Sequence, residues 1–132
     1  MIIEAQKQPL VFFVLGNYCS YNEVSFCIKE IYKIKYSNYK ILVVDDGSPD
    51  DSLLKLQKEF SSVYFIKTKL NRGYCSTFNI GCEKAFEEGA IYVFWTQNDS
   101  KKFIPNIINA IVKTFDNDKS LGLVGTKILD NE

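Results

Sequence analysis

The chain alternates short, almost wholly apolar runs with segments whose apolar residues recur at every third or fourth position. An unbroken apolar run is typical of a strand buried on both faces, and the three-to-four spacing is typical of a helix that packs by one face. Strands and helices in regular alternation indicate a parallel sheet with helices on both sides. We therefore predict a three-layer α/β/α fold with a mostly parallel sheet.

These patterns also place the individual elements. Strands are predicted near residues 10–15, 40–45, 63–67, 91–95 and 121–124, and helices near residues 22–32, 74–88 and 104–115. A further helix after the second strand is expected to take Ser48 as its N-cap and Pro49 as its first residue, followed by two aspartates at the positive end of the helix dipole. Gly89 stands where a glycine commonly ends a helix.

Charge and residue types exclude several classes of function. The chain has 16 basic and 16 acidic residues, so its charge gives no reason to expect binding to nucleic acid. It has no histidine, so histidine-based catalysis is excluded and any metal ion must be bound by oxygen or sulfur. None of the four cysteines belongs to a C-x-x-C pair. We expect reduced thiols packed in the core of a cytoplasmic protein rather than a zinc site.

A length of 132 residues favours a single domain. We place this domain at residues 10–132, after an N-terminal extension at residues 1–9 that is too polar for a signal peptide. The longest apolar runs are far shorter than a membrane-spanning helix, so we expect no transmembrane segment.

Polar residues follow each of the first four predicted strands. These polar segments are residues 17–22, 45–48, 71–73 and 97–100. Parallel strands end at the same edge of a sheet, and ligands bind beyond that edge. We therefore expect the four segments to form one site.

Two of these segments carry carboxylates in positions suited to ligand binding. Asp45 and Asp46 directly follow the second strand, where they are able to hold a ribose hydroxyl, a base N–H group or a metal ion, or only to cap the next helix. Asp99 follows the fourth strand, where a carboxylate is well placed for a hard divalent cation such as Mg²⁺. Helix capping is again the alternative.

The segment after the third strand is Asn71-Arg72-Gly73, directly before a helix. A glycine at a helix N-terminus lets a phosphate approach the backbone N–H groups. Within that helix, Asn79 and Gly81 are poor helix formers. Their presence indicates close packing or ligand contact at these positions, or a solvent-exposed face.

The order and spacing of these motifs resemble those of family-2 glycosyltransferases with the GT-A fold. The motifs, in strand order, are Tyr21-Asn22-Glu23, Asp45-Asp46-Gly47-Ser48, Asn71-Arg72-Gly73-Tyr74 with Asn79-Ile80-Gly81, and Gln97-Asn98-Asp99. The pattern is most similar to the rhamnosyltransferase-like branch, and residues 124–130 resemble that branch's segment after the fifth strand. The likeness covers about residues 10–130.

The resemblance implies a Rossmann-like GT-A fold with strand order 3-2-1-4. It implies inverting transfer of a sugar from a nucleotide-diphospho-sugar donor to a saccharide or lipid-linked acceptor. It also implies that Asp99 binds a divalent cation, Mn²⁺ or Mg²⁺. The residues that would bind the nucleotide-sugar are Tyr21, Asn22, Asp45, Asp46, Ser48, Asn71 and Gly73.

Two departures from the family pattern keep a second hypothesis open. Gln97 stands where the family's metal-binding D-x-D motif has its first acid, although Asn is common there in this branch. Catalytic domains of the family usually run well beyond this length and carry the acceptor site and the catalytic base in their second half. We therefore expect a further C-terminal portion or a homodimer, and we name no catalytic base. The alternative function is a non-catalytic nucleotide-binding or interaction module.

Overall fold

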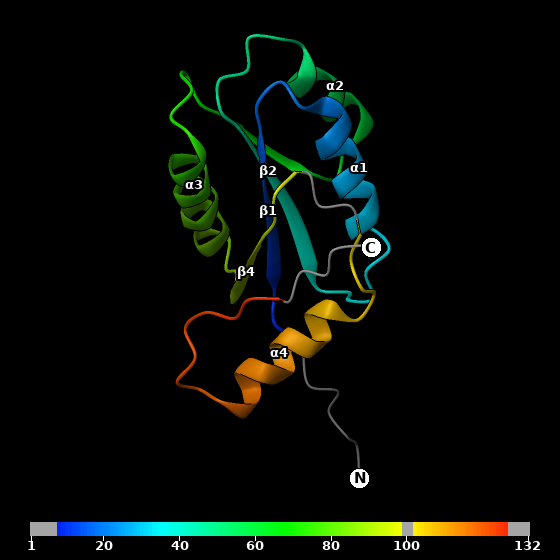
Figure 1. Cartoon of the computed structure of the whole chain (residues 1–132), viewed down its shortest axis with the longest axis vertical. Coiled ribbons are helices and arrows are strands. Elements are labelled where there is room, and N and C mark those ends of the chain that lie inside the picture. The colour runs from blue at the N-terminus through cyan, green and yellow to red at the C-terminus, as the bar shows by residue number, and fades with distance from the viewer. Residues whose placement is uncertain (1–7, 99–101, 127–132) are drawn as a thin grey trace, which may run out of the picture.

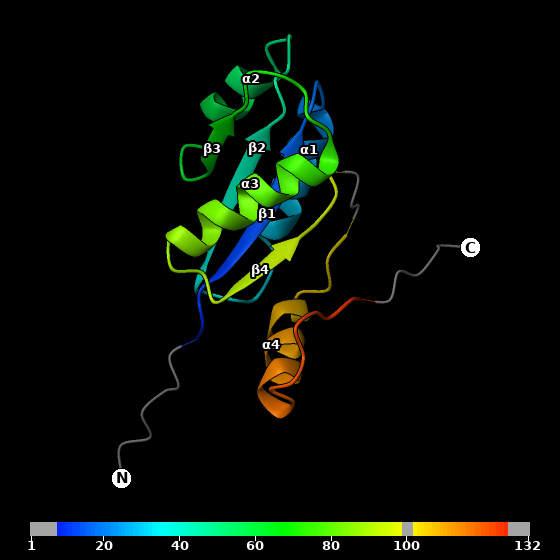
Figure 2. The same cartoon turned by 90° about the vertical axis from the view of Figure 1, so that its left-hand side faces the viewer.

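A four-stranded parallel sheet with the order β3-β2-β1-β4 forms the middle of the molecule (Figures 1 and 2). The computed structural model describes residues 8–98 and 102–126. In chain order, the elements are β1 (Val11–Asn17), α1 (Tyr21–Ile31), β2 (Tyr39–Asp45), α2 (Ser52–Glu59), β3 (Tyr64–Lys67), α3 (Tyr74–Glu87), β4 (Tyr92–Trp95) and α4 (Ile107–Asn117). The predicted α/β/α fold, the strand order and the central position of the first strand are confirmed.

Both faces of the sheet are buried, which explains its continuous apolar strands. Along β1, Phe13 and Leu15 pack with α1 and α2 on one face, and Phe12 and Val14 pack with α3 on the other. All four side chains are 0% exposed. Figures 1 and 2 show the same division of the helices between the two faces. Right-handed crossovers require this division of the helices. The chain moves in one direction from β1 to β3 and in the opposite direction from β3 to β4, so the helices of the two paths lie on opposite faces.

Helix α4 lies at the amino ends of the strands, away from their carboxyl ends (Figure 1). Ile108 of α4 is 1% exposed in the core, and Phe115 stacks on Tyr92 at the start of β4 with a centroid separation of 4.8 Å. The side-chain amide of Asn109 donates to the backbone oxygen of Lys35 at 2.7 Å. Within residues 8–98 and 102–126, no helix, α4 included, is long and apolar enough to cross a membrane.

Helix α3 approaches the sheet closely at Gly81. A Cβ at this position would lie 2.2 Å from Cγ1 of Val14, far inside van der Waals contact. Val14 is buried and β-branched, so its methyl groups have little freedom to turn away. The two poor helix formers therefore have different explanations. Gly81 is required for close packing, whereas Asn79 lies on the exposed face of α3.

Two predictions about the secondary structure are wrong, and each failure has a physical reason. Ser48 does not cap α2, which begins at Ser52 with Asp51 in the N-cap position. The Ser48 hydroxyl donates instead to the buried carboxylate of Asp45, at 2.6 Å. Residues 121–124 form no strand, and in the described part of the chain β4 pairs only with β1. A strand requires a neighbouring strand for its backbone groups, and no strand among the described residues pairs with this segment.

The four cysteines form no disulfide, and they differ in burial. Cys27 is buried and Cys82 is half-buried, but Cys19 and Cys75 are exposed. The prediction of core thiols is therefore right for Cys27 and wrong for the two exposed residues. The predicted helix end at Gly89 is confirmed by its φ of 85°, directly after the C-cap of α3.

We predict that Gly81→Ala destabilises the fold by a net of about 1–2 kcal/mol. Overpacking a core costs about 1–3 kcal/mol, and the better helix propensity of alanine offsets up to about 1 kcal/mol of that. Urea unfolding followed by circular dichroism measures the change. The control is Asn79→Ala on the exposed face of the same helix, which should leave the free energy of unfolding equal or slightly raised. A Gly81→Ala protein as stable as this control would contradict the close packing.

Candidate functional site

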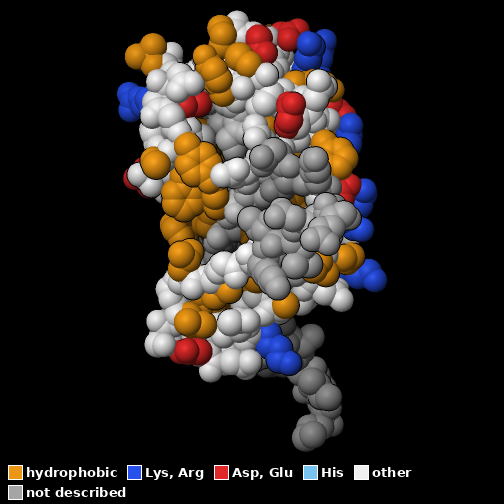
Figure 3. Space-filling view, in the orientation of Figure 1, with side chains coloured by type: hydrophobic (Ala, Val, Ile, Leu, Met, Phe, Trp, Pro, Cys, Tyr) orange, Lys and Arg blue, Asp and Glu red, His pale blue; other side chains and the backbone are white. Residues whose placement is uncertain are grey.

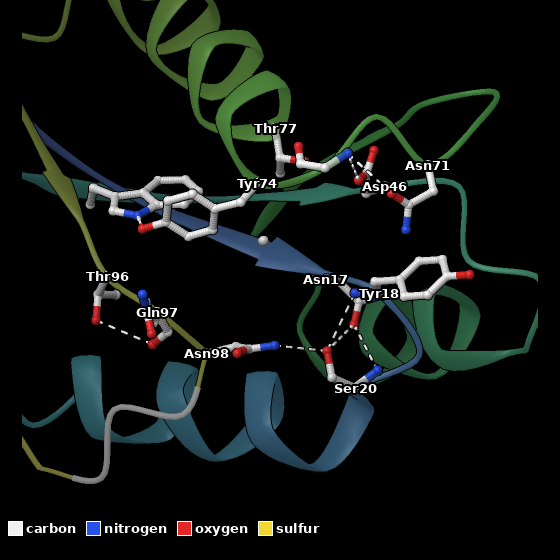
Figure 4. Close-up of a pocket in the computed structure, with 13 residues that line it drawn as sticks. Asn17, Tyr18, Ser20, Asp46, Asn71, Tyr74, Thr77, Thr96, Gln97 and Asn98 are labelled. Carbon is white, nitrogen blue, oxygen red and sulfur yellow. Dashed lines mark hydrogen bonds between the residues drawn. The ribbon is translucent and has the colours of Figure 1, made fainter.

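The carboxyl ends of the strands surround a pocket of about 360 Å³ (Figure 4). Pairing of β4 with β1 stops at Val14 and Trp95, whereas β1 goes on pairing with β2 as far as Asn17 and Asp45. The last residues of β1, Leu15–Asn17, therefore extend past β4, and the pocket opens beside them. The pocket thus lies beyond the carboxyl ends of the strands, the edge at which parallel α/β sheets bind ligands.

A buried hydrogen-bond network holds the ends of β1 and β2 together beneath the pocket. The side-chain amide of Asn17, 1% exposed, donates to Oδ1 of Asp45 at 2.6 Å and lies 3.0 Å from the hydroxyl of Ser52. Ser48 donates its backbone N–H and its hydroxyl to the same carboxylate, at 3.1 and 2.6 Å. Asp45 is 0% exposed, so these donors must replace the water that it loses. Among the described residues, no buried side-chain nitrogen or oxygen lacks a hydrogen-bond partner.

Asp46 faces the pocket and also holds the loop between β3 and α3. Its two carboxylate oxygens accept the backbone N–H groups of Arg72 and Gly73, at 2.9 and 2.8 Å. A carboxylate has about four acceptor positions, so acceptor capacity remains for a ligand. Asn71 belongs to the same loop and lines the pocket beside Asp46 (Figure 4).

Gly47 allows this loop to lie directly against the end of β2. Its φ of 71° is in the left-handed region. A Cβ there would also lie 2.9 Å from the backbone carbonyl carbon of Leu70. Only glycine avoids both the strain and the clash. The two loops therefore pack backbone against backbone, and this contact brings the polar residues that follow β2 and β3 to one end of the pocket.

Tyr74 and Trp95 form the wall of the pocket on the α3 side. The Trp95 ring packs edge-on against Tyr74 and, behind it, Phe78, with centroid separations of 5.0 and 4.8 Å. The indole N–H of Trp95 donates to the Tyr74 hydroxyl. Apolar side chains gather along this side of the molecule in Figure 3. Tyr18, from the loop after β1, lies at the other end of the pocket, near Asn71 (Figure 4).

The loop after β4 forms the remaining rim and is tied to the loop after β1. Asn98 donates its side-chain amide to the hydroxyl of Ser20 at 2.8 Å, and both Asn98 and Gln97 line the pocket. Asp99, the predicted metal ligand, lies outside the described residues.

The donor atoms of this rim fit the predicted class of metal ion. Ser20, Gln97 and Asn98 offer hydroxyl and amide oxygens, which suit Mg²⁺ or Mn²⁺ better than zinc. In the described part of the chain, no group of three or more cysteine, aspartate or glutamate side chains is arranged to hold a metal. A hard divalent cation needs few protein carboxylates, because water and substrate phosphates complete its shell.

Comparison with known families identifies the domain. The family model described as glycosyl transferase family 2 matches residues 15–130, a range that includes every segment lining the pocket. The chain belongs to glycosyl transferase family 2. Its sheet order and the placement of its helices are those of the GT-A fold. No curated protein sequence gives a significant match.

Solved glycosyltransferase structures share the fold of this family-2 domain. S. aureus TarS 1–349 gives a TM-score of 0.70 at 16% identity, over 83% of this chain and 33% of that chain. The mannosyltransferase PcManGT from Pyrobaculum calidifontis, in complex with GDP-Man and Mn²⁺, gives a TM-score of 0.70 at 17% identity, over 83% of this chain and 33% of that chain. S. aureus TarS 1–349 in complex with UDP-GlcNAc gives 0.70 at 16% identity, over 83% and 32%. The chain thus spans about a third of the length of these structures, and the likeness shows the fold alone.

The structure brings some of the predicted site residues of the family-2 domain to the pocket and keeps others beneath it. Asp46, Asn71 and Gly73 line the pocket. Asp45 and Ser48 lie in the buried network that supports it. The two aspartates of the Asp-Asp-Gly-Ser motif therefore face different surroundings.

Tyr21 and Asn22 do not line the pocket. Tyr21 is the first residue of α1, and its hydroxyl donates to Glu59 of α2 at 2.6 Å, which raises the pKa of Tyr21. Lys29 contacts the same carboxylate at 2.6 Å, and hydrogen bonds from Lys29 and then Tyr21 lower the pKa of Glu59. Asn22 is exposed on α1. Tyr21 thus joins two helices on one face of the sheet.

Several pocket residues were not predicted. Tyr18 and Ser20 belong to the polar segment that follows the first strand, so a signal for them was present. Only the start of α1 separates Tyr18, in the loop, from Tyr21, in the helix. Tyr74 ends the motif Asn71-Arg72-Gly73-Tyr74 and so had a signal, whereas Trp95 resembles a core residue of a strand in the sequence.

We predict that Asn17→Ala lowers the free energy of unfolding by about 2–3 kcal/mol, because it leaves a buried carboxylate without one of its donors. Chemical denaturation measures the loss. The control is Asn109→Ala, which removes an exposed amide with one hydrogen bond and should cost less than about 1 kcal/mol. Equal losses in the two variants would show that the Asn17–Asp45 contact contributes no more than a surface hydrogen bond.

Proposed function

We propose that this family-2 domain binds the nucleotide-diphospho-sugar donor of an inverting glycosyl transfer. The observation that carries the proposal is that Asp46 from one sequence motif and Asn71 and Gly73 from another line one pocket at the strand carboxyl ends. The volume of about 360 Å³ is within the range of about 300–1,000 Å³ that is usual for small-molecule sites. Structures of the same fold in complex with GDP-Man and Mn²⁺, and with UDP-GlcNAc, support this ligand class.

In this proposal the nucleoside occupies the end of the pocket formed by Asp46, Asn71 and Tyr18. The remaining acceptor capacity of Asp46 suits a base N–H group or a ribose hydroxyl. Asn71 offers both a donor and an acceptor. The Tyr18 ring is 49% exposed at this end and provides a face on which a base is able to stack.

The diphosphate lies toward the start of α3 and the loop after β4. Helix α3 begins directly after Gly73, so the positive end of its dipole is at the pocket. Asp99, together with oxygens of Gln97 and Asn98, would hold Mn²⁺ or Mg²⁺. A cation bound there would neutralise charge on the leaving nucleoside diphosphate.

The described pocket residues are suited to bind the nucleotide-sugar donor, and none of them is suited to act as the general base. Inverting transfer requires a base that removes the proton from the attacking acceptor hydroxyl. Among the described residues that line the pocket, Asp46 is the only carboxylate, and both of its oxygens accept backbone N–H groups. We therefore assign donor binding, and not activation of a saccharide or lipid-linked acceptor, to these residues.

Nucleoside diphosphates are expected to raise the melting temperature of the chain, with a larger shift in Mn²⁺. A ligand that binds only the native state adds about 2.7 kcal/mol of stability at about 100 times its Kd. A thermal-shift screen of UDP, GDP, their sugar conjugates and the free nucleosides measures the effect. The absence of any shift across this panel would sink the proposal.

Asp99→Ala should reduce the shift given by a nucleoside diphosphate in Mn²⁺ and leave the shift given by the free nucleoside unchanged. The reason is that the carboxylate acts on the metal–pyrophosphate unit, which the nucleoside lacks. Asp116→Ala, which changes an exposed aspartate of α4 at the far end of the sheet, is the control. Equal losses for both ligands would assign Asp99 a structural role, such as a helix cap.

The purified chain is expected to bind nucleotide and to transfer no sugar. Loss of a general base removes about 10²–10⁴-fold in rate, and loss of acceptor positioning lowers the rate further. A radiolabelled sugar-transfer assay over a panel of donors and acceptors, with Mn²⁺ and Mg²⁺, tests this. Turnover that follows the chain through purification and disappears in Asp99→Ala would place a base within these residues. Such turnover would also rule out the alternative function, a non-catalytic binding module.

A further inference from the structure

The hydroxyl of Tyr74 is a pocket group that the arrangement above does not use. Tyr74 is the first residue of α3, lines the pocket and is 52% exposed. Its hydroxyl accepts the indole N–H of Trp95. An indole N–H only donates, and a phenolic hydroxyl has one hydrogen of its own. The contact with Trp95 therefore directs the Tyr74 hydrogen to an acceptor other than the indole.

The surrounding rings hold this hydroxyl in place. The planes of Tyr74 and Trp95 meet at 83°, and Phe78 packs against Trp95 at 78°. Trp95 is the last residue of β4 and pairs with Val14 of β1, so the indole is anchored to the sheet. A change in χ1 of Tyr74 would break both the ring contact and the hydrogen bond. A donor held in this way loses little conformational freedom when a ligand arrives.

The charge of the pocket indicates which acceptor atom this hydroxyl meets. None of the 13 described lining residues is lysine or arginine, and Asp46 carries the only full charge among them. An anionic ligand must therefore be held, on the protein side, by neutral donors and helix dipoles. Tyr74 stands at the positive end of α3, where the dipole favours a negative group. Its hydroxyl is a neutral donor on a residue at this end of the helix.

We propose that the Tyr74 hydroxyl donates a hydrogen bond to a phosphate oxygen of the bound nucleoside diphosphate, and that Trp95 is the positioning residue that orients it. The inference rests on the proposed function, since it names a further contact of the same site. It makes the aromatic wall a determinant of specificity for the diphosphate over the nucleoside. It also accounts for the pairing of a tyrosine with the single tryptophan of the chain.

The test is isothermal titration of the full chain with UDP, GDP, uridine and guanosine in Mn²⁺. Tyr74→Phe keeps the ring and removes the hydroxyl, and it should weaken binding of the diphosphate about tenfold while binding of the nucleoside stays the same. The control is Tyr32→Phe, because Tyr32 is also a half-exposed tyrosine with one hydroxyl contact, to Ser62, but lies outside the pocket. It should change neither affinity. Quenching of Trp95 fluorescence in the wild type and in Tyr74→Phe is an independent readout at the wall itself.

Trp95→Phe tests the positioning role. It removes the N–H donor and should weaken diphosphate binding selectively. The double variant Tyr74→Phe/Trp95→Phe should lose no more affinity than Tyr74→Phe alone, because the two residues act through one hydroxyl. Additive losses would overturn the positioning role of Trp95.

Other outcomes would overturn the assignment of Tyr74. Equal losses for UDP and uridine in Tyr74→Phe would mean that the hydroxyl only shapes the pocket. A loss seen with UDP-GlcNAc or GDP-Man, but not with UDP or GDP, would assign the hydroxyl to the sugar rather than to the phosphate. If the wild-type chain binds no nucleotide at all, the proposed function itself fails. Unchanged diphosphate binding in Tyr74→Phe removes only this inference.

Discussion

The hydrogen bond between the side chains of Asn17 and Asp45 joins the ends of the two central strands, and the pocket depends on it. These residues are register partners, and the backbone N–H of Asp46 donates to the backbone oxygen of Asn17 at 2.8 Å. Tyr18 follows one member of the pair and Asp46 follows the other, so the polar end of the pocket is built directly on the buried contact. A buried carboxylate is tolerated only when its donors are in place. The network therefore specifies one arrangement of both loops.

This arrangement explains why two adjacent aspartates follow β2. Asp45 turns inward, is 0% exposed and serves the scaffold, whereas Asp46 turns toward the pocket and holds the loop that carries Asn71. Gly47 then permits the contact between that loop and the strand end. The three residues therefore have three roles: Asp45 packs in the core, Asp46 faces the pocket and Gly47 contacts the neighbouring loop. They differ because successive residues at a strand end point in different directions.

The sequence predicted the sheet well and the site only in part. Residues such as Phe12 to Leu15 are apolar at every position because both faces of β1 are covered, and this pattern has few alternative explanations. The start of α2 was misplaced because Ser48 bonds to the carboxylate of Asp45, three residues earlier, and this local contact competes with capping of the helix. Tyr18 and Tyr21 have similar local sequence signals, yet one lines the pocket and the other bonds to Glu59. Which of them reaches the pocket depends on where a helix begins, and sequence patterns locate helix ends poorly.

The fit between Gly81 and Val14 limits how this domain is able to move. Many α/β domains close around a ligand by shear, in which a packed helix slides by a small amount over its sheet. Here α3 leaves no room for even a Cβ between residue 81 and a Val14 methyl, and this close packing resists such a slide. The start of α3, with Tyr74, is therefore fixed relative to β1. Ligand binding is therefore expected to leave α3 in place on the sheet.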